Sequence, residues 1–266
     1  MTSLAHDSPE LAETYDRLSD SQFAGGKRLV GRLDVKEGDR VLDVGCGTGR
    51  LARWIASITG PAGVVGIDPL VDRVQVARTH AQGIAFEVGS AEDLGAFADG
   101  SFDVVCMSAV FHWVADKPKA LREVRRVLKP GGHLGLTTPP KDLRGVSTTA
   151  QLVGPLLGER YSGKFNPGGF AVANAGCTVS ELLNLIVEAQ LDVMELHVVR
   201  RTQSFVRGQD VVDFLQSSSF GNFGRLVTDD ASSAFQADLA SAFDARKGPE
   251  GIVLHDHGVM LIAARA

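Results

Sequence analysis

The sequence predicts an α/β protein with a doubly wound, mostly parallel sheet, and three observations lead to that prediction. Short apolar runs alternate with segments of helical period as far as residue 138, an order that is typical of parallel sheets with helices on both faces. The first run ends in a carboxylate and a glycine-rich turn, Asp43 to Gly49, which is how open α/β sheets present a ligand. With 266 residues, 44% of them hydrophobic, the chain can bury a substantial core.

Strands are expected where apolar runs are short and end at polar residues or glycine. The run 102–107 is the clearest, because its largely apolar character fits a parallel strand buried on both faces. The expected strands are residues 40–44, 63–67, 84–88, 102–107, 133–137, 191–199 and 251–263.

Helices are expected where apolar residues recur every three or four positions. Asp116 is the expected N-cap of one of them, and the spacing of Thr178 and Glu181 is that of a capping box that opens another. The first 38 residues are partly helical, and Lys129 to Gly132 should stop a helix. The other helices are expected from the glycine turn to Gly60 and at about 71–81, 117–128, 178–189, 209–216 and 231–245.

Composition narrows the functional classes. The formal net charge of −5 gives no electrostatic footprint for nucleic acid or an anionic membrane. No apolar run approaches the roughly 20 residues that cross a bilayer, and the first ten residues lack the features of a signal peptide. Three scattered cysteines indicate a reduced, cytoplasmic protein. A monomer and a homodimer are both left open.

The turn after the first strand carries the most specific signal. Gly45, Gly47 and Gly49 follow Asp43 as G-x-G-x-G, with the small residue Cys46 inside the turn. This spacing differs from the G-x-G-x-x-G that brings a pyrophosphate to a helix N-terminus. A carboxylate before the turn repels phosphate and favours a cationic group such as an amine.

Together with the preceding carboxylate, this turn resembles the first motif, D-x-G-x-G-x-G, of the class I S-adenosylmethionine-dependent methyltransferases. Three later blocks extend the resemblance over residues 40–138, and they are similar to those of the trans-aconitate and the ubiquinone and menaquinone biosynthesis enzymes. These blocks are Phe102-Asp-Val-Val, Ser108-Ala-Val-Phe-His-Trp-Val114 and Leu128-Lys-Pro-Gly-Gly132. The resemblance implies a Rossmann-like methyltransferase fold of seven strands with the last one antiparallel. It also implies S-adenosylmethionine as cofactor and S-adenosylhomocysteine as product.

Two positions after later strands are candidates for contacts with the cofactor. Asp68 ends the second strand, where a carboxylate can accept hydrogen bonds from ribose hydroxyls; its alternative role is to cap the loop before Pro69, and its spacing also suits an NAD site. In the resembled family the loop Ser90-Ala91-Glu92 borders the adenine. Here Ser90 stands where an aspartate is common, so the loop is either an adenine contact or a solvated turn.

The block after the fourth strand supplies the catalytic candidate. His112 is a candidate general base, because imidazole exchanges protons near neutral pH; alternatively it is a structural histidine beside Trp113. Trp113 is either a wall of the pocket or core, and Tyr15 either covers the cofactor or packs as an ordinary aromatic. The expected cofactor-binding residues are Tyr15, Asp43, Gly45, Cys46, Gly47, Gly49, Asp68, Pro69, Ser90, Ala91, Glu92, Ser108 and Trp113.

Substrate selection is assigned to the second half of the chain. Residues 1–38 are expected to form an N-terminal helical cap and 39–138 the cofactor-binding core. Residues 139–266 should hold lid segments, 139–176 and 203–247, together with the last helix and strands of the sheet. A Ser/Gly/Phe loop at 217–224 is expected to touch substrate or cofactor. The candidate substrate contacts are Phe165, Phe220, Asn222 and Phe223; the alternative for the phenylalanines is packing beneath long loops.

The predicted activity is methyl transfer to a small, partly apolar molecule, with oxygen favoured as the acceptor over carbon or nitrogen. One alternative is a non-enzymatic S-adenosylmethionine-binding protein, which needs the same pocket but no turnover. The other is an NAD-dependent oxidoreductase, which the G-x-G-x-G spacing and Asp43 disfavour. No metal is expected, because His255 and His257 supply only two ligands on one face of the last strand.

Overall fold

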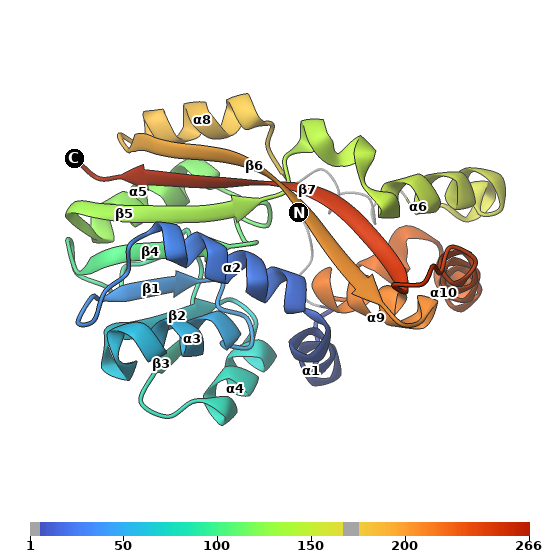
Figure 1. The fold of residues 1–266 in the computed structure, drawn as a ribbon, viewed down its shortest axis with the longest axis horizontal. Coiled ribbons are helices and arrows are strands. Elements are labelled where there is room, and N and C mark those ends of the chain that lie inside the picture. Colours follow the sequence, from blue (N-terminus) through green and yellow to red (C-terminus); the bar gives the residue numbers. More distant parts are fainter. Residues whose placement is uncertain (1–5, 167–175) are drawn as a thin grey trace.

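The computed structural model describes residues 6–166 and 176–266, and a single seven-stranded sheet organises them (Figure 1). The strand order is β3-β2-β1-β4-β5-β7-β6. The first five strands are parallel, whereas β7 runs antiparallel to both β5 and β6. The strands are β1 (Val41–Val44), β2 (Val64–Asp68), β3 (Ala85–Val88), β4 (Phe102–Ser108), β5 (Leu128–Thr138), β6 (Asp192–Phe205) and β7 (Ile252–Ala264). The doubly wound sheet with an antiparallel last strand is therefore confirmed.

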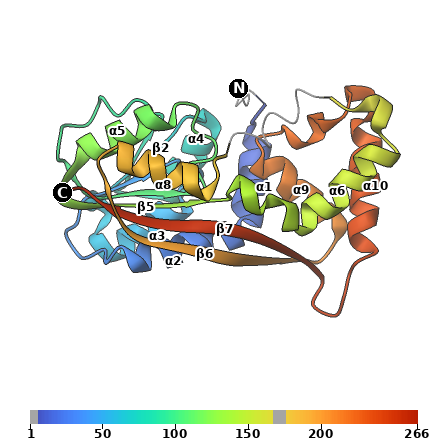
Figure 2. The ribbon, with the colours of Figure 1, turned by 90° about the horizontal axis from the view of Figure 1, so that it is seen from above.

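Helices cover both faces of this sheet, as Figure 2 shows edge-on. On one face, α2 (Asp20–Arg32), α3 (Arg50–Thr59) and α4 (Val71–His80) bury their apolar sides. On the other, α5 (Lys117–Val127) and α8 (Val179–Glu188) do the same. Because β1 and β4 are parallel neighbours, their carboxyl ends lie side by side at one edge of the sheet, where the strand order reverses.

The expected caps begin these helices. The Asp116 side chain accepts from the amide of Lys119, and Thr178 and Glu181 form the full capping box of α8. The helix α5 ends at Val127, as expected, but the chain then enters β5 at once instead of making a turn. Lys129 to Gly132 form an irregular stretch of that strand, in which Gly131 donates to the carbonyl oxygen of Arg265 at 2.7 Å.

A second group of helices lies beyond the carboxyl edge of the sheet (Figures 1 and 2). It contains α6 (Thr148–Glu159), α9 (Gly208–Ser218) and α10 (Asp229–Asp244), which share an apolar core around Phe235 and Phe243. The strands β6 and β7 pair along their whole length and extend out of the sheet to reach this core. The helix α1 (Pro9–Leu18) packs against α9 and α4 and closes the remaining side.

Two elements differ from the expectation. The strand β6 continues to Phe205 instead of ending at 199, because each added residue gains a partner on β7. The helix α6 lies in the expected lid segment 139–176, where no helix was predicted. Ser147 caps this helix, and Pro155 lies inside it. Within the described residues, no helix has both the length and the apolar character needed to span a membrane.

Candidate cofactor and substrate site

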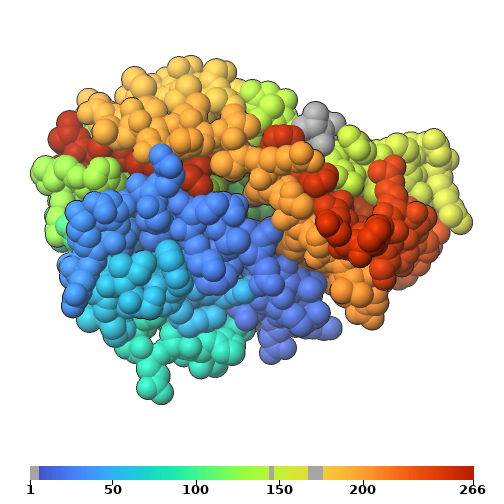
Figure 3. All heavy atoms as spheres, in the orientation of Figure 1, coloured from blue at the N-terminus to red at the C-terminus, as the bar shows by residue number. Residues whose placement is uncertain are grey.

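A cavity of about 840 Å³ opens at the carboxyl ends of β1, β2 and β4. Its walls come from these strand ends, from α1 and the start of α2, from the end of α9 and from the extended part of β6 and β7. Figure 3 shows a recess between the N-terminal helices, in blue, and β6, in orange. The cavity therefore lies between the sheet and the second group of helices, where open α/β folds bind their ligands.

The glycine turn forms the floor of this cavity, and its glycines have different tasks. All three have positive φ values, which side chains disfavour. A Cβ at Gly45 would lie 2.3 Å from Val110, and one at Gly49 would lie 2.8 Å from Phe86, so both allow close packing. A Cβ at Gly47 would meet only Tyr15, at 3.9 Å, and Gly47 lines the cavity.

Asp43 is the most unusual group in the cavity wall. Its side chain is 2% exposed, and among the described residues no donor reaches its Oδ2. Burial, together with the negative charge of Asp68, raises the pKa of Asp43 to about 7. A buried carboxylate oxygen without a partner is costly, and a cationic amino group in the cavity would satisfy it.

Asp68 has one of the two roles considered for it at the end of β2: its carboxylate caps the loop. Its Oδ2 accepts from the amide of Gly47 and its Oδ1 accepts from the amide of Leu70, each at 2.9 Å. Burial raises its pKa even though these bonds favour the charged form. Each carboxylate oxygen can accept a further hydrogen bond, and Asp68 lines the cavity. The carboxylate thus caps the loop and also lines the cavity.

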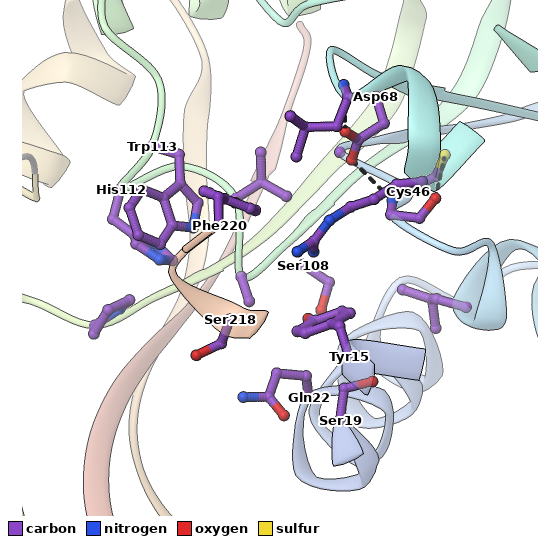
Figure 4. A pocket seen from close by; sticks show the side chains of 18 of the residues that line it. Tyr15, Ser19, Gln22, Cys46, Asp68, Ser108, His112, Trp113, Ser218 and Phe220 are labelled. Atoms are coloured by element: carbon purple, nitrogen blue, oxygen red, sulfur yellow. Dashed lines mark hydrogen bonds between the residues drawn. The ribbon is translucent and has the colours of Figure 1, made fainter. Parts of the chain in front are cut away.

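The end of β4 brings His112 and Trp113 to the opposite wall (Figure 4). Ala109, just before them, has a φ of +59°, and its amide donates to the carbonyl oxygen and the hydroxyl of Thr137. Such a conformation costs energy in a residue with a side chain and is typical of functional sites. The His112 ring lies 4.8 Å from the Trp113 ring, and its Nδ1 is 3.5 Å from Thr138 Oγ1.

Most of the expected cofactor contacts meet in this cavity. Besides Asp43 and Asp68, its lining contains Tyr15, Gly45, Cys46, Gly47, Pro69, Ser90, Ala91, Glu92, Ser108 and Trp113. Glu92 also holds the backbone, since its Oε1 accepts from the amide of Ala115 at 2.9 Å. Gly49 does not line the cavity: it starts α3 and packs against Phe86 and Ala77.

The expected substrate contacts separate into one that lies in the cavity and three that do not. Phe220 lines it, with its ring 4.8 Å from that of Trp113. Phe223 packs on Phe235, at 6.0 Å, in the core of the second helix group. Asn222 donates to the carbonyl oxygen of Ser219 at 2.8 Å, and Phe165 forms a bridge with Val227. The helix α9 runs to Ser218, and Phe220 is the residue of the following turn that lines the cavity. Residues 167–175 of the expected lid segment 139–176 lie outside the described residues.

Several residues of the lining have no counterpart in the expected set. One is Arg73, which is 3% exposed on α4; its signal was a charge in helical register with the buried Val74 and Ala77. Six further residues form a polar strip on α2 and on the extended strands: Ser21, Gln22, Arg201, Gln203, His255 and Asp256. On β6 the signal was that Arg201 and Gln203 alternate onto one face, but only the pairing of β6 with β7 beyond the sheet gives that face a cavity.

Comparison with known proteins identifies the part of the chain that carries the glycine turn. A family model described as a methyltransferase domain matches residues 42–136, from β1 to β5. That range contains Asp43, the glycine turn, Asp68 and His112, which the fold brings to one cavity. Residues 42–136 form a class I S-adenosylmethionine-dependent methyltransferase domain. S-adenosylmethionine is the cofactor of such domains, and the chemistry of the cavity fits it: an unpaired carboxylate oxygen stands where the resembled motif implies a cationic amine.

The relatives of this methyltransferase domain are named for different methyl acceptors. A demethylmenaquinone methyltransferase from Symbiobacterium thermophilum is 36% identical over 136 residues, 47% of this chain and 54% of that protein. A malonyl-[acyl-carrier protein] O-methyltransferase from Erwinia pyrifoliae is 36% identical over 145 residues, 54% of each chain. The chain thus spans about half the length of the relatives that it matches.

Solved structures agree with the fold over most of the chain. A putative methyltransferase from Bacillus halodurans superposes with a TM-score of 0.61 at 22% identity, covering 91% of this chain and 99% of that one. A geranyl diphosphate methyltransferase in complex with its cofactor gives a TM-score of 0.54 at 16% identity, covering 92% and 85%. At these identities the likeness concerns the fold alone.

Proposed function

We propose that the protein transfers a methyl group from S-adenosylmethionine to a small, partly apolar molecule, with a hydroxyl oxygen as the acceptor. The observation that carries the proposal is Asp43, which lines the cavity and whose buried Oδ2 has no donor among the described residues. A ligand that brings a cationic amine relieves that oxygen. A dinucleotide brings a pyrophosphate, which the same carboxylate repels.

The residues around the glycine turn would hold the cofactor. Asp43 would pair with its amino group and Asp68 would accept from its ribose hydroxyls. Gly47 leaves the backbone open at the floor, and the loop Ser90-Ala91-Glu92 would border the adenine. When bound, the cofactor supplies an electrophilic methyl group, so the protein needs no nucleophile of its own.

The rest of the cavity would hold the acceptor. Trp113 and Phe220 give it an aromatic wall, and Gln203 on β6 belongs to a polar strip on the other side. This mixture suits a molecule that has an apolar body and hydrogen-bonding groups. His112, in the same wall as Trp113, would take the proton from the acceptor hydroxyl as the new bond forms. We propose that the α6, α9 and α10 group, together with α1, serves as the lid that excludes water during transfer.

Calorimetric titration with S-adenosylhomocysteine, with NAD run alongside, tests the cofactor. We expect micromolar binding of the former alone, about −8 kcal/mol. Binding of NAD instead, or of neither compound, would contradict the proposal. A panel of small hydroxylated acceptors, tested with cofactor labelled at its methyl group, then tests turnover. Tight cofactor binding without transfer to any of them would favour the non-enzymatic alternative.

A further inference from the structure

A buried arginine connects three segments around the cofactor pocket. Arg73 on α4 donates to both carboxylate oxygens of Asp7, at 3.0 and 3.2 Å. Its guanidinium also donates to the carbonyl oxygen of Ser217, near the end of α9, at 2.6 Å. The side chains of Arg73 and Asp7 are only 4% and 3% exposed. The N-terminal segment, α4 and α9 therefore meet at one charged group that is closed off from solvent.

Two aromatic rings complete this cluster. The guanidinium carbon of Arg73 lies 4.5 Å from the centre of the Tyr15 ring and 4.6 Å from that of Phe220. Both rings line the cavity, Tyr15 from α1 and Phe220 from the turn after α9 (Figure 4). Arginine gains from such stacking as well as from a two-pronged ion pair. The same group thus supports two pieces of the cavity wall that are about 200 residues apart in the chain.

The backbone beside the cluster is under constraint. Phe220 has a φ of +57°, which is uncommon for a residue with a side chain. Gly221 follows with a φ of +74°, and a Cβ there would lie 2.7 Å from the carbonyl oxygen of His6. The N-terminal segment therefore rests directly on the turn after α9. A strained turn persists only when its surroundings hold it in place, and here the Arg73 cluster does so.

We propose that the Asp7–Arg73 ion pair is a latch: it holds the N-terminal segment and the end of α9 together over the cofactor pocket. Ligand entry and ligand exit then both wait for this pair to separate. Separation leaves two charges without partners in a buried place, which is costly, so the closed arrangement dominates with or without ligand. The inference rests on the proposed function only because it takes S-adenosylhomocysteine as the ligand.

A latch has a kinetic signature that a ligand contact lacks. Weakening it favours the open state equally in the free and the bound protein, so association and dissociation accelerate together and the dissociation constant changes little. Losing a direct contact to the ligand would instead accelerate dissociation alone. Losing a merely structural pair would lower thermal stability and leave both rate constants as they were.

The test is stopped-flow binding of S-adenosylhomocysteine to the Asp7→Asn variant, followed by tryptophan fluorescence, because Trp113 lines the cavity. We expect both rate constants to rise at least about tenfold while their ratio stays within about threefold. Glu195→Gln is the matched control, since it breaks another ion pair of the N-terminal region, with Arg32 at 2.6 Å, outside the cavity. Unchanged rate constants in Asp7→Asn, or faster dissociation alone, would overturn the latch.

Hydrogen exchange of the ligand-free protein provides a second test that does not depend on the ligand. In Asp7→Asn, amides in residues 6–19 and 217–224 should both exchange faster than in the wild type, whereas the strands β1 and β4 keep their protection. Loosening of the N-terminal segment alone would contradict the proposed link to α9. If S-adenosylhomocysteine fails to bind the wild type, the proposed function fails, and the exchange experiment still decides about the latch.

Discussion

The carboxylate of Asp68 accepts a 2.9 Å hydrogen bond from the amide of Gly47, so the end of β2 holds the ligand-facing turn that follows β1. Its other oxygen accepts from the amide of Leu70, which begins the connection to α4. One buried side chain therefore shapes two loops and also faces the cavity. Replacing it should affect the binding site and the stability of the ligand-free protein together.

Asp68→Ala should weaken the binding of S-adenosylhomocysteine by about 1–3 kcal/mol, because ligand hydroxyls and two loop amides lose their acceptor. Titration calorimetry measures the affinity, and thermal denaturation should show a lower melting temperature. Asp103→Ala is the control: Asp103 also accepts from a backbone amide, that of Arg40 at 2.9 Å, but it does not line the cavity. An Asp68→Ala variant with wild-type affinity would show that the carboxylate does not contact the ligand.

Asp43 should make cofactor binding depend on pH. Its pKa is about 7 in the ligand-free protein, and a cationic amine beside it would lower that pKa, so binding releases a proton. Affinity for S-adenosylhomocysteine should fall as the pH drops below 7, approaching about tenfold per pH unit. Asp43→Asn should bind S-adenosylhomocysteine more weakly, and its affinity should not change with pH in this way. Comparing the pH profiles of the variant and the wild type isolates the contribution of Asp43. Parallel pH profiles of both proteins would exclude Asp43 from amine recognition.

The same carboxylate should lower the stability of the ligand-free protein at high pH. Its pKa is raised on folding from an ordinary value of 3.8, so the folded state holds the proton more tightly than the unfolded state. Stability therefore falls as the pH rises from about 4 to 7 and stays low above that range. At pH 8, Asp43→Asn should raise the free energy of unfolding by up to about 4 kcal/mol, and at pH 4 by much less. Denaturant titrations at the two pH values measure this difference, and an equal effect at both would refute the assignment.

A feature of the fold or of the site is predictable from the sequence when residues close to it in the chain determine it. The glycine turn, the Asp116 cap and the capping box at Thr178 act within a few residues, and the structure contains all three. The parallel order of the strands follows from their alternation with helices. Boundaries that depend on distant partners were not predictable in this way: β6 is long because β7 pairs with it to the end.

The parts of the site that the sequence did not predict also depend on contacts between distant parts of the chain. The helix α6 contains Pro155 and gains its stability from packing, since Val153 and Leu157 are buried against the core of α9 and α10. Arg73 belongs to the cavity only because Asp7 and Ser217 come from opposite ends of the chain to meet it. The candidate Phe223 had the right composition, but the turn at Phe220 directs it to the helical core.

Substitutions at two glycines of the turn should affect ligand affinity and protein stability differently. In Gly49→Ala the new Cβ would lie 2.8 Å from Phe86 and about as close to Ala77, so the protein should lose several kcal/mol of stability. In Gly47→Ala the new Cβ would lie beside the cavity, with Tyr15 at 3.9 Å, and the backbone strain should cost about 1–2 kcal/mol. Gly47→Ala should therefore fold and yet bind S-adenosylhomocysteine at least about tenfold more weakly. Calorimetry and thermal denaturation of both variants measure this split, and equal effects on both properties would contradict it.

His112 should matter for turnover and not for cofactor binding. Because a hydroxyl must lose its proton as it attacks the methyl group, His112→Ala should slow transfer by about 10²–10⁴-fold while its affinity for S-adenosylhomocysteine stays at the wild-type value. More acidic analogues of the acceptor need less help from a base, so they should recover much of the lost rate in the variant and gain little in the wild type. Thr138→Val, which removes the hydroxyl 3.5 Å from Nδ1, should slow transfer less than His112→Ala does. Transfer at the wild-type rate in His112→Ala, or a loss that is the same for every analogue, would remove His112 from the role of base and leave it as part of the wall beside Trp113.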